Sequence, residues 1–289
     1  MNNSSSQTNE SQAMQPERRL LYIFTRTPLH VGAGASVGAI DQPIIRERHT
    51  GFPVIPGSSI KGVLRDACRN HDQFAKLEQA IFGQQDTAGT ISFGEAKILA
   101  FPVRSARGSF AFISCPLALD RFLRERVADR QLEVPDEPEE MACLAGETVT
   151  ITRNGHTGVV LEEYRFNRTG AFPQSWEKVL LDLLNDPVWK TGKSRFVLLS
   201  NGDFSHFVRN ACEVSQHVAI DPGKGTAKSG ALFNLEAVPA ETLFFAPVTA
   251  SARAKDELRG LEKLLAAKPV LQLGGDSTTG LGFCTVKLA

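Results

Sequence analysis

The stretch at residues 29–66, LHVGAGASVGAIDQPIIRERHTGFPVIPGSSIKGVLRD, decides how this chain is interpreted. Its first part contains several glycines and is followed by Asp41. The charged run RERHTGFP at 46–53 comes next, and the last residues have an amphipathic pattern. Long irregular segments inside a compact domain are usually functional or disordered. The closely spaced turn residues of this segment favour an ordered, functional one.

A helix is predicted at the end of this stretch. Pro56 and Gly57 interrupt the preceding extended run, and Ser58 is a favourable N-cap residue. Apolar residues then recur at helical spacing between positions 60 and 68. We therefore expect a helix that begins at Ser58 and buries one face in the core.

The same helix offers a candidate anion site. Lys61 and Arg65 lie four residues apart and share a second face. Free N–H groups at a helix start, next to a lysine on the first turn, favour binding of an anion such as phosphate. The alternative is that both basic residues only form the solvated face of an amphipathic helix.

The overall charge argues against a uniformly basic nucleic-acid-binding protein. The 32 lysines and arginines equal the 32 aspartates and glutamates among 289 residues. Any binding to nucleic acid must therefore use a local patch. Residues 18–69 provide one, with eight basic side chains (Arg18, Arg19, Arg26, Arg46, Arg48, Lys61, Arg65 and Arg69) against three acidic ones (Asp41, Glu47 and Asp66).

The cysteine pattern argues against a disulfide framework and a structural zinc site. The five cysteines are odd in number, scattered, and never at C-x-x-C spacing. No apolar run approaches the roughly 20 residues that span a bilayer. Residues 1–18 are polar and lack a hydrophobic signal core, so we expect a disordered tail on a cytoplasmic protein without a membrane partner.

Strands and helices are mixed along the rest of the chain. The expected strands are residues 20–25, 89–93, 96–99, 109–114, 195–200, 242–248, 270–273 and 283–288, and the expected helices are 73–82, 116–128, 175–184 and 251–267. A hairpin with a rather long connection is expected around Asn154 and Gly155, and residues 221–230 look like the tip of a projecting hairpin. The pattern at 204–220 is ambiguous. This mixture favours an α+β domain with a largely antiparallel sheet.

Asp41 is the sharpest candidate for chemistry. An acid beside a glycine-rich segment and a basic run can ligate a metal or move a proton during phosphodiester cleavage. A lone aspartate more commonly caps a turn. His30 precedes the glycines and either assists Asp41 or is structural. The spacing of Gly32, Gly34 and Gly38 matches a dinucleotide-binding loop only weakly, because the segment after Asp41 lacks the helix that this motif requires.

Four stretches together resemble a known family. They are the run at 29–66, IFG followed by AGTISFGEAKILAFPVRS at 81–105, GALFNLEAVPAETLF at 230–244, and LQLGGDSTTGLG at 271–282. These stretches resemble the RAMP superfamily of CRISPR systems. The run IDQPIIRERHTGFPVIPGSSIKG at 40–62 is most similar to the repeating backbone subunit of type III-B effector complexes. The resemblance extends from about residue 19 to residue 288.

The resemblance implies both an architecture and an activity. It implies a ferredoxin-like, RRM-like palm with finger and thumb insertions, in a single domain at 19–289 whose thumb lies at about 205–236. Copies would stack head to tail along a CRISPR RNA, with other subunits of the complex alongside. The thumb would wedge between guide and single-stranded target RNA. Each copy would then be an endoribonuclease that uses Mg²⁺ or Mn²⁺ and the target's own 2′-hydroxyl as the nucleophile.

The resemblance also assigns residues to roles. Asp41, His30 and Glu236 are the expected catalytic residues, and Asp41 is the expected metal ligand. The expected RNA-binding residues are Ser58, Ser59, Lys61, Gly62, Arg46, Arg48, Arg65, Gly274, Gly275 and Gly280. The glycines near the C-terminus let the backbone approach a ligand closely, although such a loop is also a tight turn between two strands.

Two other functions stay open at this point. The chain could be a non-catalytic RNA-binding scaffold of the same kind of complex, because an acid can be present without activity. It could also be a ribonuclease that processes CRISPR precursor RNA. The RERHTGFP motif and the lack of a general-base cluster argue against the processing enzyme.

Overall fold

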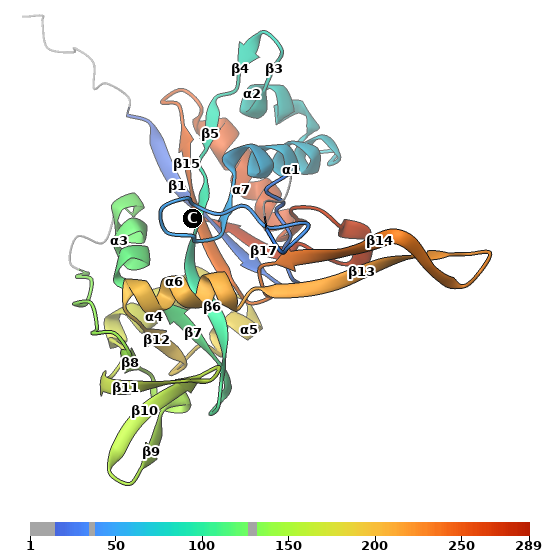
Figure 1. The fold of residues 1–289 in the computed structure, drawn as a ribbon. Coiled ribbons are helices and arrows are strands. Elements are labelled where there is room, and N and C mark those ends of the chain that lie inside the picture. The colour runs from blue at the N-terminus through green and yellow to red at the C-terminus, as the bar shows by residue number, and fades with distance from the viewer. Residues whose placement is uncertain (1–14, 35–37, 127–131) are drawn as a thin grey trace, which may run out of the picture.

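Strand β1 (Glu17–Thr25) is the first element of the structure, a computed structural model that describes residues 15–34, 38–126 and 132–289 (Figure 1). The predicted strand at 20–25 is confirmed, but it begins earlier. Glu17 and Arg18, which the sequence placed in a tail, pair with Ala250 and Thr249 of a neighbouring strand. Residues 1–14 of the predicted tail lie outside the described residues.

The strands form one large sheet. Its order is β16 (Val270–Gln272), β17 (Phe283–Leu288), β1, β15 (Leu243–Ala250), β6 (Ala96–Ser105), β7 (Ser109–Ser114), β12 (Phe196–Leu198), β8 (Ala142–Ala145), β11 (Tyr164–Gly170), β10 (His156–Leu161) and β9 (Ile151–Arg153), with β2 (Val54–Ile55) on β6 and β5 (Ile91–Phe93) on β15. Among these described strands, β11 pairs with β8 and β12 with β7 in parallel, and the other pairings are antiparallel. The α+β expectation with a largely antiparallel sheet is confirmed.

Apolar residues cover both faces of the sheet. In β1, Leu21 and Ile23 join one core cluster, whereas Leu20, Tyr22 and Phe24 join the other. This alternation explains why β1 is an unbroken apolar run, since a strand buried on both faces shows no polar positions. The first cluster includes side chains of α1 (Gly57–Arg69), α2 (Glu78–Phe82), α6 (Asn201–Asn210) and α7 (Lys255–Ala267), and the second includes those of α3 (Pro116–Glu125), α4 (Gln174–Leu183) and α5 (Pro187–Lys190).

Helix α1 forms as predicted, except at its first turn. The predicted apolar face is confirmed by the burial of Ile60, Leu64, Ala67 and Cys68. The prediction that Ser58 caps the helix is wrong, because the carbonyl of Pro56 accepts hydrogen bonds from the N–H groups of residues 59 and 60 and the helix starts at Gly57. A side chain at position 57 would collide with the backbone carbonyl of Phe93. The glycine is therefore needed for close packing of the helix start.

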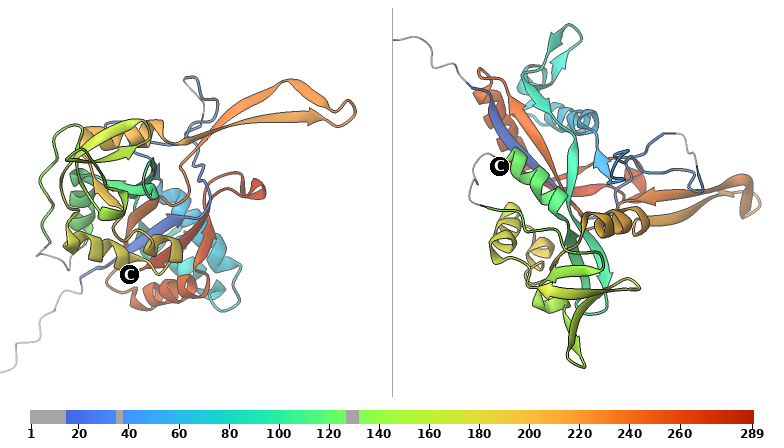
Figure 2. Two further views of the ribbon diagram at one scale, coloured as in Figure 1. Left: turned by 90° about the horizontal axis from the view of Figure 1, so that it is seen from below. Right: turned by 60° about the vertical axis from the view of Figure 1, so that its left-hand side comes forward.

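A projecting hairpin leaves the body of the molecule (Figures 1 and 2). It consists of β13 (Glu213–Asp221) and β14 (Thr226–Ala237), which form their own two-stranded sheet. The ambiguous segment at 204–220 resolves into the end of α6 followed by β13. Four large aliphatic side chains of the projecting hairpin are exposed: Val214, Val218, Ile220 and Leu232. An isolated hairpin is marginally stable in water, so its base must be anchored by other segments.

Several predicted boundaries are corrected by hydrogen bonding. The hairpin at Asn154 and Gly155 has a two-residue connection rather than a long one, because Arg153 pairs with His156. Both turn residues have positive φ, 52° and 77°, as a type I′ turn requires. The predicted helix at 73–82 divides into a 3-10 turn (Ala75–Leu77) and α2, and Gly83 ends it with φ of 80°.

The remaining elements are short. They are the hairpin of β3 (Gly83–Gln84) and β4 (Thr87–Ala88), and the 3-10 helices Glu147–Val149 and Ser277–Thr279. Within the described ranges, no helix has the length and apolarity needed to cross a membrane.

Candidate functional site

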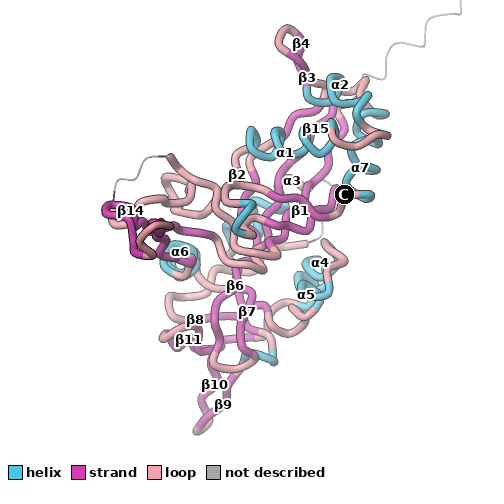
Figure 3. Tube along the Cα trace, turned by 90° about the vertical axis from the view of Figure 1, so that its right-hand side faces the viewer, coloured by secondary structure: helices cyan, strands magenta, loops and turns pink. Residues whose placement is uncertain are grey.

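A strap, defined as residues 41–46, runs along the base of β14. The N–H of Gln42 donates to the carbonyl of Asn234, and the N–H of Glu236 donates to the carbonyl of Gln42, both at 3.0 Å. Gln42 thereby forms a parallel bridge with Leu235. Figure 3 shows the surrounding loops, in pink, between β14 and β2. The outer edge of β14 is therefore paired at its root, where the projecting hairpin meets the body.

Asp41 lies at the start of the strap with its side chain exposed. Its Oδ2 accepts a hydrogen bond of 2.8 Å from the N–H of Asn234. Its Oδ1 has no hydrogen-bond partner among the described residues. The carboxylate is thus held by one oxygen, while the other has no protein partner in an exposed side chain.

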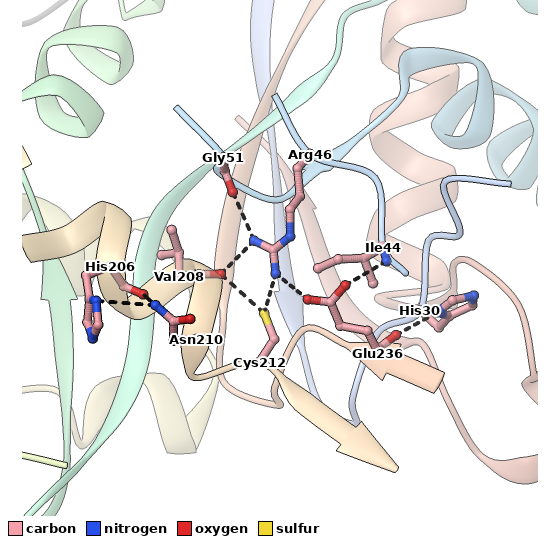
Figure 4. A network of polar contacts seen from close by, with 9 residues as sticks. All are labelled: His30, Ile44, Arg46, Gly51, His206, Val208, Asn210, Cys212 and Glu236. Atoms are coloured by element: carbon pink, nitrogen blue, oxygen red, sulfur yellow. Dashed lines mark hydrogen bonds and ion pairs between the residues drawn. The ribbon is translucent and has the colours of Figure 1, made fainter. Parts of the chain in front are cut away.

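Glu236 is the most engaged carboxylate of the site (Figure 4). Its Oε1 lies 2.5 Å from Nη2 of Arg46, and its Oε2 accepts a hydrogen bond of 3.0 Å from the N–H of Ile44. The side chain is 6% exposed and that of Arg46 is 19% exposed. Both residues therefore hold the strap to β14, and neither side chain lies open at the surface as its predicted role would require.

His30 lies beside the same strand and is buried. Its Nδ1 is 2.7 Å from the backbone carbonyl of Glu236. A carbonyl only accepts, so Nδ1 carries a proton and donates it to this bond. The hydrogen bond fixes the imidazole against β14 (Figure 4).

The predicted glycine loop packs on the segment that carries His30. The N–H of Gly275 donates to the carbonyl of His30 at 2.9 Å. Gly274 has φ of 77°, and a side chain there would collide with that carbonyl. Gly280 has φ of 91° and faces open space. Gly274 is thus explained by close backbone packing, whereas Gly280 is explained by its turn conformation.

The charged run at 46–49 does not form one basic face. Arg46 and Glu47 point inward, and Glu47 forms a buried ion pair of 2.9 Å with Arg121 of α3. Arg48 and His49 are exposed. Of the predicted RNA-binding arginines, Arg48 is therefore the one available at this surface.

The first turns of α1 present polar groups without protein partners. The side chains of Ser58, Ser59 and Lys61 make no hydrogen bond or ion pair with the described residues, and Gly62 is exposed with open space around it. Arg65 is different. Its guanidinium donates to the carbonyls of Phe82 and Gly83 and lies 3.2 Å from Glu78. Arg65 therefore ties α1 to α2 and has few donors left for RNA.

The donor set does not fit a resident metal ion. Within the described ranges, no group of three or more His, Cys, Asp and Glu side chains is placed to hold one. A divalent ion at Asp41 would have a single protein oxygen and would depend on water and nucleic acid for its other ligands. The described side chains by themselves therefore do not make a metal centre.

Sequence reasoning missed three groups that complete the site. They are the N–H of Asn234, the carbonyl of Val208 and the thiol of Cys212, the last two of which accept hydrogen bonds from Arg46 at 2.7 and 3.3 Å. No local pattern marks them, because two are backbone groups and all lie more than 160 positions from their partners in the strap.

A family model described as the RAMP superfamily matches residues 23–285. The chain therefore belongs to the RAMP superfamily. Among curated proteins, it is 35% identical over 285 residues to the "CRISPR system Cmr endoribonuclease Cmr4" of Pyrococcus furiosus, covering 93% of this chain and 95% of the relative.

Solved structures agree with this assignment. The oligomeric Cmr4 of Pyrococcus furiosus superposes with a TM-score of 0.74 at 31% identity, covering 94% of this chain and 99% of the other. A chain from the type III-B Cmr-beta complex bound to cognate target RNA also gives a TM-score of 0.74, at 18% identity and with 94% and 97% coverage. The second likeness supports the fold alone.

Proposed function

We propose that this chain is the repeating backbone subunit of a type III-B CRISPR effector complex, which binds CRISPR RNA and cleaves complementary target RNA. The observation that carries the proposal is the open carboxylate oxygen of Asp41 at the root of the projecting hairpin, in a chain that matches a named endoribonuclease over almost its whole length. The complex would act in the cytoplasm.

The chemistry needs no protein nucleophile. The 2′-hydroxyl of a target nucleotide attacks the adjacent phosphorus while its proton passes to Oδ1 of Asp41. The bond to the 5′-oxygen of the next nucleotide breaks, and this oxygen takes up a proton from solvent. The products are a 2′,3′-cyclic phosphate and a 5′-hydroxyl. General base catalysis of this kind contributes about 10²–10⁴-fold to a rate.

The rest of the fold supports the positioning of RNA. The side chains of Ser58, Ser59 and Lys61, which have no partner among the described residues, would hold the guide backbone at the start of α1, where phosphate is favoured. In this proposal the part of the sheet around β1 is a ferredoxin-like palm, and the projecting hairpin is the thumb of a single domain at 19–289. The thumb's exposed aliphatic side chains would contact bases or a neighbouring copy in a head-to-tail stack.

The role of a divalent ion stays a prediction. Mg²⁺ or Mn²⁺ would have to be brought largely by RNA phosphates, since among the described residues Asp41 is not part of a group of three or more metal-ligating side chains. His30 also stays a predicted participant, through its free Nε2.

The proposal is tested in a complex reconstituted with guide RNA and end-labelled target. Asp41→Asn keeps an oxygen for the N–H of Asn234 but cannot accept the proton, whereas Asp41→Ala loses both. We expect both variants to assemble and bind target normally, and both to lose the regularly spaced cuts by at least about 100-fold. Wild-type cutting rates in Asp41→Asn would remove Asp41 from proton transfer.

A scaffold function is the second candidate, because the hydrogen bond from Asn234 to Asp41 is also what a purely structural turn would use. Tight target binding without any cutting by the wild-type complex would favour it. The cleaving subunit and the scaffold should both assemble into a multimer on RNA. A precursor-processing enzyme should instead elute from gel filtration as a small species with or without RNA.

A further inference from the structure

We propose that Arg46 and Glu236 are a positioning pair that fixes the root of the projecting hairpin and, through it, the placement of Asp41. This inference rests on the proposed function and replaces the expectation that Glu236 acts in the chemistry and Arg46 contacts RNA. The evidence comes from which segments the two side chains join (Figure 4).

Arg46 contacts the segment that leads into β13 and the end of β14. Its Nη1 donates to the carbonyl of Val208 at 2.7 Å, and its Nη2 donates to Sγ of Cys212 at 3.3 Å, immediately before β13 begins. Its Nη2 also pairs with Glu236 near the end of β14. One planar guanidinium therefore links the chain entering the hairpin to the chain leaving it, and it sets the direction in which the hairpin projects.

A fourth contact connects Arg46 to the turn that follows the strap. Nη1 of Arg46 also donates to the carbonyl of Gly51 at 2.9 Å. The charge is thus surrounded by acceptors from the 46–51 turn, the end of α6 and β14. A partly buried cation with four contacts has one favoured position, because any displacement leaves an acceptor unpaired.

Glu236 carries the same restraint along the strap to Asp41. Its Oε2 accepts the N–H of Ile44, and two residues away on β14 the N–H of Asn234 donates to Asp41. Two residues of extended chain span about 7 Å. The backbone bridge of Gln42 lies between these two contacts, so all three fasten one strap to β14. In this proposal, loss of the Glu236 contact shifts the strap and with it the carboxylate of Asp41.

Burial argues against direct chemistry by either side chain. Glu236 has both oxygens engaged, one by a cation and one by an N–H, and its side chain is 6% exposed. It could reach an RNA hydroxyl only by abandoning both contacts. A carboxylate with both oxygens engaged acts through its geometry.

The test uses Glu236→Gln and Arg46→Lys in the reconstituted complex. Glutamine keeps the size but has one acceptor oxygen where glutamate has two, and lysine keeps the charge but has all its donors on one nitrogen instead of the two that Arg46 uses. We expect guide binding close to that of wild type, and single-turnover cleavage reduced about 10- to 100-fold, since misplacement by about 1 Å can lower a rate 10²-fold. Hydrogen exchange should accelerate at the amides of Ile44 and Asn234.

Asp186→Asn is the matched control. Asp186 is also a carboxylate with 6% exposure, has an arginine partner, Arg26, and accepts backbone N–H groups, but it lies at the start of α5. We expect it to change neither cleavage nor exchange in the strap.

Three results separate the possibilities. If Glu236 were the proton acceptor, Glu236→Gln would abolish the acidic limb of the pH–rate profile; positioning predicts that the limb persists at a lower plateau. Unchanged exchange at Ile44 and Asn234 in Glu236→Gln would overturn the inference even if cutting fell. If the wild-type complex does not cut, the proposed function fails, whereas the exchange result still decides the role of the pair.

Discussion

Gly62→Ala separates the stability of α1 from its proposed contact with RNA. Gly62 lies inside α1, is exposed, and has no atom within 4 Å of the position that an added Cβ would take. Alanine is favoured over glycine in a helix interior by about 0.8–1.0 kcal/mol. The free energy of unfolding should therefore rise by about 1 kcal/mol. The proposed guide contact at the start of α1 predicts that an added methyl group here would crowd the RNA backbone.

The assay has two parts. Urea unfolding of the chain without RNA should show a higher midpoint for Gly62→Ala, and guide RNA binding by fluorescence anisotropy should weaken about tenfold, which corresponds to about 1.4 kcal/mol. Gly202→Ala in α6 is the matched control, since Gly202 is also exposed and its added Cβ would meet only Oγ of Ser200, at 3.8 Å. It should not weaken RNA binding.

Gly260→Ala should test whether the gain in the free energy of unfolding requires open space around the glycine. Gly260 is buried in α7, where a Cβ would collide with Leu77. Overpacking of this kind destabilises by about 1–3 kcal/mol. If Gly62→Ala is destabilising, the helix start is not open as described. If it is stabilising and binds guide RNA as tightly as wild type, the guide does not approach Gly62.

Two further predictions concern the glycine loop and the thiol beside Arg46. Gly274→Ala should lower the free energy of unfolding by about 1–3 kcal/mol, because it combines a positive φ with a collision against the carbonyl of His30. Gly280→Ala, which has only the positive φ, should cost about 1–2 kcal/mol, and equal losses in denaturation would contradict the close approach at Gly274. Burial raises the pKa of the Cys212 thiol to about 11. Because the thiolate is the nucleophile, iodoacetamide should label Cys212 slowly near pH 8 in the folded chain and faster as the pH approaches about 11. Mass spectrometry measures the labelling, and rapid labelling near pH 8 would contradict the burial of this thiol.

Local patterns predicted much of the fold. The spacing of Ile60, Leu64, Ala67 and Cys68 indicated the buried face of α1, and the apolar run at 20–25 indicated β1. These predictions succeed because helical and strand periodicities depend on residues close in sequence. Helix starts were less predictable. The first N–H groups of α1 donate to the carbonyl of Pro56 and not to the side chain of Ser58. The helix starts at Gly57 because a residue without a side chain can pack closely on β5.

By itself, the sequence predicted the α+β class, which the structure confirms, and proposed Asp41 and its segment as the site. Only the tertiary structure decided what the neighbouring charges do. Arg46 and Glu236 are 190 positions apart, and neither pattern nor composition shows that they form a buried pair. The sequence placed Arg46 in a basic run and suggested contact with RNA, and the family resemblance suggested a catalytic role for Glu236. Folding brings the two together at the root of the projecting hairpin, where each charge offsets the cost of removing the other from water.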